Sequence, residues 1–237
     1  MGMPITVEIV DFVSGDIFDK VFSFFKYIDQ KFSTYKKNSE ITKINDLRFT
    51  INESSEEMKT IFRLAEQTRK ETNGYFDIFH NGKYDPSGIV KGWAIFNAAK
   101  LLNEMGVKNF YIDCGGDVQV QSSKFKVKSW KIGIKNPFKQ DEIIKIIYLK
   151  NGGVATSGTY IRGSHIYNPK GQMSDEIVSL TVIGPNVYEA DRFATAGFAM
   201  GKKGIEFIEK LKGFEGYQIN KDGIATMTSG FEKYTIN

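Results

Sequence analysis

Two oxygen-bearing side chains lie one helical turn apart in an otherwise apolar stretch late in the chain. The stretch is Ala190-Asp-Arg-Phe-Ala-Thr-Ala196, so Asp191 and Thr195 are four residues apart. Residues at this spacing share one face of a helix. A carboxylate and a hydroxyl on one face offer two oxygen ligands to a hard cation such as Mg²⁺. The spacing also fits an exposed aspartate and a threonine bonded to the preceding turn, which is common in helices.

A second polar segment, Asp85-Pro-Ser-Gly-Ile-Val-Lys91-Gly92, leads directly into a predicted helix. The free backbone N–H groups and the dipole at a helix start favour a bound phosphate. Lys91 adds positive charge, although a cation in the first turn opposes the dipole unless an anion shares the site. A simple turn followed by a solvated lysine is the alternative.

Two further segments combine glycines with polar residues. Asp113-Cys-Gly-Gly-Asp117 ends a predicted strand, where paired glycines form either a concave set of N–H donors or a plain hairpin turn. Gly152–Gly158 carries two adjacent hydroxyls and precedes His165. A lone histidine is more often structural than catalytic, but its unperturbed pKa near 6.5 suits a general base at neutral pH.

Hydrophobic periodicity predicts the elements that must position these residues. Helical spacing of apolar residues indicates a helix over Asp16–Phe32. A Ser54/Glu57 capping box starts a second helix that ends at Gly74, and a third runs from about Val90 to Met105, with Lys91 in its first turn. A strand precedes them at Ile5–Val10.

Strands dominate the second half of the predicted chain. The predicted chain begins mainly with helices and continues with a meander of strands to which further helices are appended. This order favours an α+β fold over regular βαβ units. The predicted strands are Asn109–Ile112, Val118–Val120, Lys131–Ile134, Ile143–Leu149, Ile177–Ile183, Gly216–Ile219 and Gly223–Met227, with helices at Val187–Met200 and Ile205–Leu211.

Composition excludes several classes of protein. The 237 residues are 41% hydrophobic and 25% charged, as in ordinary globular domains, and no apolar stretch is long enough to span a membrane. One cysteine and two histidines exclude an internal disulfide and a Cys/His zinc site. The net charge is +4 with scattered lysines and arginines, so nucleic acid is not an expected partner. Without repeats or linkers, a single domain over residues 1–237 is expected.

The order of short motifs along nearly the whole chain resembles one family, the FAD:protein FMN transferases of the ApbE type. The motifs that carry the resemblance are Met1-Gly-Met-Pro-Ile-Thr-Val, Phe32-Ser-Thr-Tyr35, Ser39-Glu-Ile-Thr-Lys-Ile-Asn45, Gly74-Tyr-Phe-Asp77, Asp85 through Gly92, Gly115-Gly-Asp117, Ala155-Thr-Ser-Gly158, His165-Ile and Ala190-Asp191 with Thr195-Ala196.

The resemblance implies a monomeric α+β fold with mixed or antiparallel sheets flanked by helices. It implies an Mg²⁺-dependent enzyme that takes FAD as substrate and moves FMN onto a Ser/Thr hydroxyl of an acceptor protein through a phosphoester bond, releasing AMP. The acceptor would be a flavoprotein or a redox-pump subunit, making protein flavinylation a post-translational modification.

The resemblance also implies roles for individual residues. Asp191, Thr195 and the main-chain carbonyl of Gly88 would hold the metal, with Asp191 also essential for catalysis, and His165 would lie by the pyrophosphate. Because its unperturbed pKa near 6.5 suits a base at neutral pH, we expect His165 to accept the hydroxyl proton. The residues implied to contact FAD are Met1, Tyr35, Tyr75, Phe76, Asp77, Asp85, Lys91, Gly116 and His165.

Two departures from the family pattern leave alternatives open. Only seven residues separate Asp77 from Asp85, where a longer insertion is usual, which predicts a more open adenine side of the site. Asn168 replaces the usual aspartate after His165, which predicts weakened proton or metal chemistry. The alternatives are therefore an FAD pyrophosphatase, which yields FMN and AMP, and a catalytically weak FAD-binding protein.

No lipoprotein signal is visible at the amino terminus, which favours a cytoplasmic location. An exported lipoprotein whose signal has been removed is the alternative, because it would begin in the same way.

Overall fold

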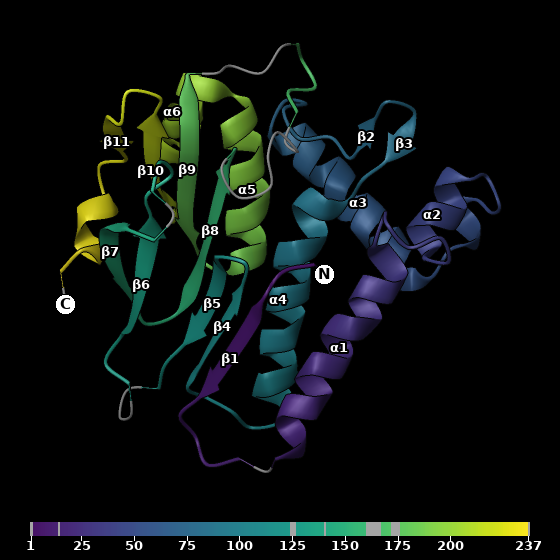
Figure 1. Ribbon diagram of the computed structural model, residues 1–237, viewed down its shortest axis with the longest axis horizontal. Helices are drawn as coiled ribbons and strands as arrows, with labels where there is room; N and C mark the ends of the chain where they lie inside the picture. The colour runs from purple at the N-terminus through teal and green to yellow at the C-terminus, as the bar shows by residue number, and fades with distance from the viewer. Residues whose placement is uncertain are drawn as a thin grey trace.

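A seven-stranded antiparallel sheet forms the centre of the protein (Figure 1). The computed structural model describes residues 2–13, 15–123, 127–139, 141–159, 167–171 and 176–236. Every neighbouring pair of strands in the sheet is antiparallel. In spatial order the strands are β1 (Ile5–Ile9), β4 (Phe110–Cys114), β5 (Asp117–Gln121), β8 (Gly152–Gly158), β9 (Ile177–Gly184), β10 (Glu215–Asn220) and β11 (Ala225–Met227).

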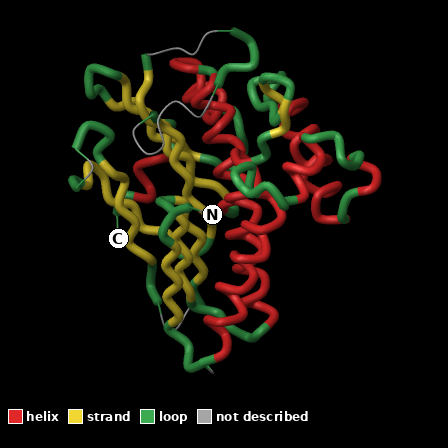
Figure 2. Tube along the Cα trace, turned by 45° about the vertical axis from the view of Figure 1, so that its right-hand side comes forward, coloured by secondary structure: helices red, strands yellow, loops and turns green. Residues whose placement is uncertain are grey.

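The helices gather on one side of the sheet, as Figure 2 shows. They are α1 (Asp16–Phe32), α2 (Glu40–Asn45), α3 (Glu56–Glu71), α4 (Ser87–Glu104), α5 (Val187–Ala199) and α6 (Gly204–Glu209), with 3₁₀ turns at Ile51–Glu53, Gly201–Lys203 and Phe231–Tyr234. Two small hairpins complete the described chain, β2 (Phe79–His80) with β3 (Lys83–Tyr84) and β6 (Trp130–Lys135) with β7 (Ile143–Leu149).

The alternation of side chains along the central strands separates the cores on the two faces of the sheet. Ala155 and Val182 pack with α5 and α6, whereas their neighbours Val154 and Ile183 pack with the β6–β7 hairpin. Successive side chains of a strand point to opposite faces, so both faces of β8 and β9 are buried. This burial on both sides explains why small residues suffice in β8, where α5 lies very close.

Two glycines permit the close approach of α5. A Cβ atom at Gly153 would lie 2.0 Å from the backbone nitrogen of Val187 at the start of the helix. A Cβ atom at Gly92 of α4 would lie 2.7 Å from Cβ of Asp191 and 2.9 Å from the carbonyl oxygen of Val187. All three distances are below van der Waals contact, so these positions require glycine for α5 to pack where it does.

A buried arginine attaches α5 to α3. Arg192 is 5% exposed, and its guanidinium forms ion pairs with Glu71 of α3 and Glu189 of its own helix. It also donates to Thr68 and lies 4.0 Å from the ring centroid of Phe193. Burial of this cation is stabilised by its two carboxylate partners and hydrogen bonds.

The predicted α+β class is confirmed, as are the strand near Ile5, the helix Asp16–Phe32 and most elements of the second half. The predicted Ser54/Glu57 box is wrong, because Ser55 caps α3 by accepting from the Met58 amide, and the capping box lies one turn earlier at Thr50 and Glu53. Helix α4 begins at Ser87, ahead of the predicted Val90.

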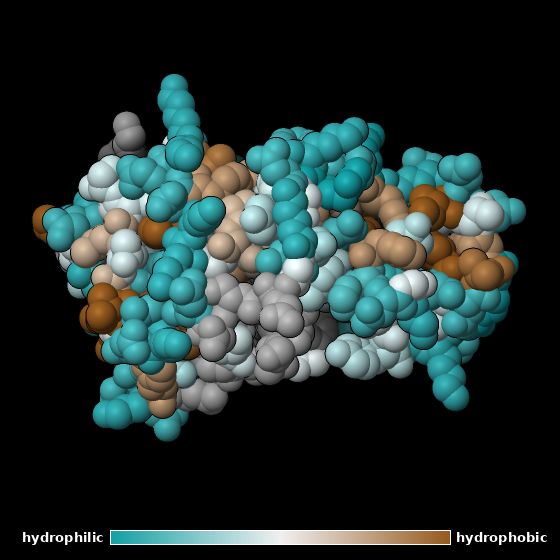
Figure 3. Space-filling model, turned by 90° about the horizontal axis from the view of Figure 1, so that it is seen from above, coloured by the Kyte–Doolittle hydropathy of each residue, from teal (hydrophilic) through white to brown (hydrophobic). Residues whose placement is uncertain are grey.

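The sequence-based prediction missed α2, both strands of the β2–β3 hairpin, and β8. Within the described ranges, no helix combines the length and apolar character needed to cross a membrane. Seen from above, the surface is mostly hydrophilic, and hydrophobic residues gather in limited areas toward the two ends (Figure 3).

Candidate active site

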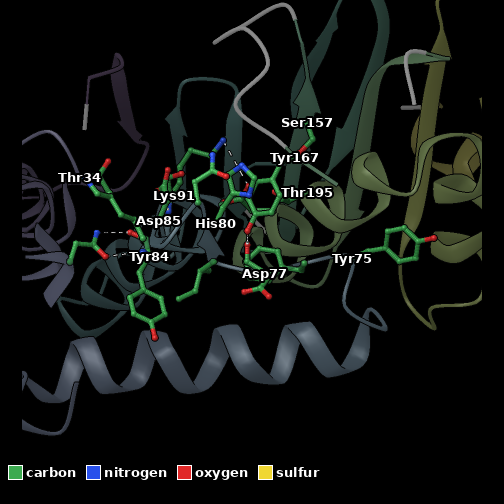
Figure 4. Close-up of a pocket in the computed structure, with 18 of the residues that line it drawn as sticks. Thr34, Tyr75, Asp77, His80, Tyr84, Asp85, Lys91, Ser157, Tyr167 and Thr195 are labelled. Carbon is green, nitrogen blue, oxygen red and sulfur yellow. Dashed lines mark hydrogen bonds and ion pairs between the residues drawn. The ribbon is translucent and has the colours of Figure 1, made fainter. Parts of the chain in front are cut away.

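A pocket of about 350 Å³ opens where the start of α4, the middle of α5, the end of β8 and the β2–β3 hairpin meet. Figure 4 shows side chains of the lining from these separate elements; the Tyr75 ring points away from the group around Lys91, His80 and Tyr167. Its lining includes eight of the residues predicted from the sequence to bind metal or FAD: Tyr75, Phe76, Asp77, Asp85, Gly88, Lys91, Asp191 and Thr195.

The predicted metal-binding face of α5 points into this pocket. Asp191 is 3% exposed, which excludes the alternative of an exposed aspartate, and Thr195 lies one turn further along the same face. Gly88 approaches from α4, where an added Cβ would lie 3.3 Å from Thr195 Cγ2 and 3.7 Å from its Oγ1. The structure therefore brings together the three residues predicted to hold a cation.

The backbone of α4 contacts the buried carboxylate directly. The amide of Gly92 donates to Asp191 Oδ2 at 2.8 Å. In a regular helix this amide donates to the carbonyl four residues earlier, which is that of Gly88. The hydrogen bond to Asp191 therefore orients both the carboxylate and the turn of α4 that carries the Gly88 carbonyl.

Lys91 lies in the second turn of α4, not in the first turn as predicted, because the helix begins four residues before it. Its ammonium lies 2.6 Å from Asp117 Oδ2 and 3.9 Å from Asp191 Oδ1, and the side chain is only 17% exposed. The alternative of a solvated lysine is thus wrong. The anion that compensates this lysine within the chain is Asp117, which sequence reasoning placed in a turn without a role.

The electrostatics of the site leave a surplus of negative charge. Asp117 and Asp191, both nearly fully buried, share the single ammonium of Lys91. Burial raises the pKa of Asp191 to about 7; Lys91 opposes this shift, and the nearby Asp117 carboxylate adds to it.

This donor set fits a hard divalent cation. A carboxylate, a hydroxyl and a carbonyl are oxygen ligands of the kind that Mg²⁺ prefers, and a cation there would offset the surplus charge of Asp117 and Asp191. In the described part of the chain, no cluster of three or more His, Cys, Asp or Glu residues offers a metal site. A magnesium site here would consequently depend on the substrate or on water for its remaining ligands.

The short segment between Asp77 and Asp85 forms part of the pocket wall, and the more open adenine side of the site stays a prediction. The segment folds into the β2–β3 hairpin, whose turn places Asn81 and Gly82 at φ +50° and +75°. His80, Asn81, Lys83 and Tyr84 from this hairpin line the pocket. The Asn-Gly dipeptide is a strong hairpin signal and would have revealed this wall from the sequence.

Side chains from two distant segments hold the hairpin in place. Asn45 of α2 donates to the carbonyl of Tyr84 at 2.9 Å and accepts from its amide at 2.8 Å. On the other strand, the hydroxyl of Tyr167 donates to the carbonyl of Asp77 at 2.5 Å, and the ring of His80 stacks on the Tyr167 ring. His80 and Tyr167 are pocket residues that sequence reasoning did not assign.

The remaining predicted FAD contacts divide into two groups. Met1 and His165 lie outside the described residues. Tyr35 is 96% exposed, and neither it nor Gly116 belongs to the described lining of the pocket, although the neighbouring Thr34 and Gly115 do. The Gly115-Gly116 pair has φ of +63° and +96° and forms the hairpin turn between β4 and β5, in agreement with the plain turn alternative.

Asp85, which lines the pocket, and Asn168 have local structural roles. Asp85 accepts from the amide of Ser87 at 3.0 Å and so stabilises the start of α4. Asn168 accepts from the amide of Lys170 at 2.9 Å, a turn contact that an aspartate would also make. Asn168 is not part of the described pocket lining, so the lost carboxylate does not belong to the Asp117–Asp191 pair.

Comparison with known proteins agrees with this geometry. The model of the ApbE family matches residues 1–83 and 79–217. The chain belongs to the ApbE family. Among curated ApbE relatives, the FAD:protein FMN transferase of Klebsiella pneumoniae is 29% identical over 59% of this chain and 43% of its own length, and that of Haemophilus influenzae is 30% identical over 53% and 40%. The chain spans about half the length of the curated relatives it matches.

Solved ApbE structures have the same fold over almost the whole chain. The ApbE protein of Thermotoga maritima superposes with a TM-score of 0.85 at 26% identity and covers 99% of this chain and 96% of its own. The flavin transferase ApbE of Vibrio cholerae superposes with a TM-score of 0.83 at 21% identity and the same coverage of both chains. The α+β architecture is therefore that of the ApbE fold.

Proposed function

We propose that this protein is an Mg²⁺-dependent FAD:protein FMN transferase that acts as a single domain over residues 1–237. The observation that carries the proposal is the convergence of Asp191, Thr195 and Gly88 with Lys91 in one pocket, built from two helices that touch at Gly92. The names of the curated relatives support the same activity.

The proposed reaction is a transfer of a phosphoryl-linked flavin. The oxygen of an acceptor serine or threonine hydroxyl forms a bond to the phosphorus of the FMN half, and the bond from that phosphorus to the bridging oxygen breaks. AMP leaves with the bridging oxygen, and the hydroxyl proton passes to a base. Such a transfer depends mainly on positioning and on stabilisation of developing negative charge.

The residues of the pocket divide these tasks. Asp191, Thr195 and the carbonyl of Gly88 would hold Mg²⁺, which supplies charge neutralisation at the phosphate oxygens. Lys91, held by Asp117, would contribute a fixed positive charge at the same place. Tyr75, Phe76, Asp77 and Asp85 would contact FAD, as would Met1, Tyr35 and Gly116 in the family pattern. His165 is proposed as the base that takes the hydroxyl proton.

Incubation of the protein with FAD, Mg²⁺ and a flavoprotein acceptor domain that contains one surface threonine tests the proposal. Flavin fluorescence of the acceptor on a denaturing gel, lost when that threonine is changed to alanine or when EDTA replaces Mg²⁺, is the expected result. Release of free FMN and AMP without labelled acceptor would show a pyrophosphatase instead. Unchanged FAD would show a binding protein.

The acceptor, the cytoplasmic location and the monomeric state remain predictions. The acceptor is proposed to be a flavoprotein or a redox-pump subunit with an exposed serine or threonine. Size-exclusion chromatography with light scattering checks the oligomeric state, and fractionation of cells checks the compartment.

A further inference from the structure

A pair of stacked rings forms part of the pocket wall. The ring centroids of His80 and Tyr167 are 3.8 Å apart, with 19° between the ring planes. Both residues line the pocket, and Figure 4 shows the two rings overlapping between Lys91 and Asp77. The two residues come from separate parts of the chain, so the stack forms only in the folded protein.

Tyr167 is fixed in place by its hydroxyl group. It donates to the carbonyl of Asp77 at 2.5 Å and reaches the carbonyl of Phe79 at 3.2 Å, at the base of the β2–β3 hairpin. With Asn45 holding Tyr84 on the opposite strand, both strands of the hairpin are hydrogen-bonded to other parts of the protein. The stack is therefore preorganised and does not depend on a ligand for its geometry.

His80 covers the ring of Tyr167 on one side and is itself exposed. Lys83, its cross-strand partner in the hairpin, also lines the pocket. An exposed, preorganised ring at the wall of a pocket is suited to offset stacking with a flat ring of a ligand.

We propose that His80, supported from behind by Tyr167, is the stacking surface for a fused heteroaromatic ring of the bound dinucleotide. This inference rests on the proposed function, because it takes FAD as the ligand. The flavin and the adenine of FAD present the same flat ring chemistry, and the experiment distinguishes them.

Equilibrium binding tests this role without turnover. FAD and FMN are titrated by flavin fluorescence anisotropy and ADP by calorimetry, for the wild-type protein and for His80→Ala, His80→Phe and Tyr167→Phe. Alanine replacement of a ring that stacks on a base typically weakens binding about 5- to 100-fold. We expect His80→Ala to weaken FAD binding about tenfold and His80→Phe to retain most of the wild-type affinity. Tyr167→Phe should weaken FAD binding less than His80→Ala does.

A variant of the neighbouring residue gives a matched control. Phe79 precedes His80 on the same strand but lines a separate cavity with Phe62 on α3, and it is not part of the main pocket. Phe79→Leu is therefore expected to bind FAD as the wild type does. The unfolding midpoint of each variant, followed by circular dichroism, shows whether the hairpin change has altered the fold.

The result separates this inference from the proposed function. Weakened FMN binding with normal ADP binding in His80→Ala supports a flavin stack, and the reverse supports an adenine stack. The inference is overturned if His80→Ala folds and binds FAD with wild-type affinity. It is also overturned if His80→Phe loses as much FAD affinity as His80→Ala does. Failure of the wild-type protein to bind FAD overturns the proposed function itself.

Discussion

Replacement of Gly92 by alanine is expected to disturb the candidate site by moving two helices apart. The added methyl group would lie 2.7 Å from Cβ of Asp191, 2.9 Å from the Val187 carbonyl oxygen and 3.0 Å from Asp191 Oδ2. Two of these neighbours are a backbone atom and a Cβ, which cannot swing away as the end of a flexible side chain can. Helix α5 must therefore shift relative to α4 in the Gly92→Ala variant.

Two opposing contributions set the magnitude of this effect. Overpacking of a well-packed core costs about 1–3 kcal/mol. Alanine in a helix interior is favoured over glycine by about 1 kcal/mol, which partly offsets that cost. A net loss of at most about 2 kcal/mol in the free energy of unfolding follows from these two ranges. Because the Gly92 amide donates to Asp191, activity with Mg²⁺ should fall more than stability alone explains.

Urea unfolding and the flavin-transfer assay, performed on the same samples, check this prediction. Gly15→Ala is the matched control, because Gly15 has helical backbone angles and no atom within 4 Å of an added Cβ. We expect this control to keep wild-type stability within about 0.5 kcal/mol. A Gly92→Ala protein as stable and as active as the wild type would refute the reasoning that contact between α4 and α5 sets the geometry of Asp191.

Four further predictions concern the charged residues. Asp191→Ala should lower Mg²⁺-dependent transfer by roughly 10²–10³-fold with an unchanged circular dichroism spectrum; full turnover would place the metal elsewhere. Lys91→Ala should cost about 3–5 kcal/mol in urea unfolding, because it leaves Asp117 buried without its cation, and should weaken FAD binding in titration. His165→Ala should slow transfer about 10²–10⁴-fold and leave FAD affinity nearly unchanged; a normal rate and pH profile would exclude the base. Folding raises the pKa of Asp191 from 3.8 to about 7, so the folded state holds one proton more than the unfolded state between these pH values. The free energy of unfolding in EDTA should therefore fall as the pH rises between about 4 and 7. Asp191→Asn should flatten this pH dependence.

Local signals in the sequence predicted the elements that depend on local periodicity. The apolar spacing of α1 matches its buried residues Ile17, Val21, Phe25, Ile28 and Phe32, because a helix long enough to repeat its pattern needs no distant information. The four-residue spacing of Asp191 and Thr195 likewise placed both on one face. Strand β8 was missed because Gly152–Gly158 consists of small residues, chosen by the closeness of α5 and not by strand propensity.

The partners of the site residues were beyond prediction because they depend on long-range packing. Lys91 and Asp117 meet only when α4 packs beside the β4–β5 hairpin, and Asp117 looks like an ordinary turn residue in the sequence. The contact from Tyr167 to Asp77 joins residues 90 positions apart. The hairpin that carries His80 was predictable from its Asn-Gly turn, but the ring that supports it was not.

Asp191 and Arg192 are adjacent in sequence but point in different directions from α5, because successive helix residues are about 100° apart. Asp191 faces α4 and the pocket, whereas Arg192 is bonded to Glu71 of α3 and to Glu189. Rotation of α5 that moved the Asp191 carboxylate further into the pocket would break the ion pair between Arg192 and Glu71 of α3. The position of the Asp191 carboxylate is thus set by α3 and α4 together, so a change in either helix is transmitted through α5 to the candidate site.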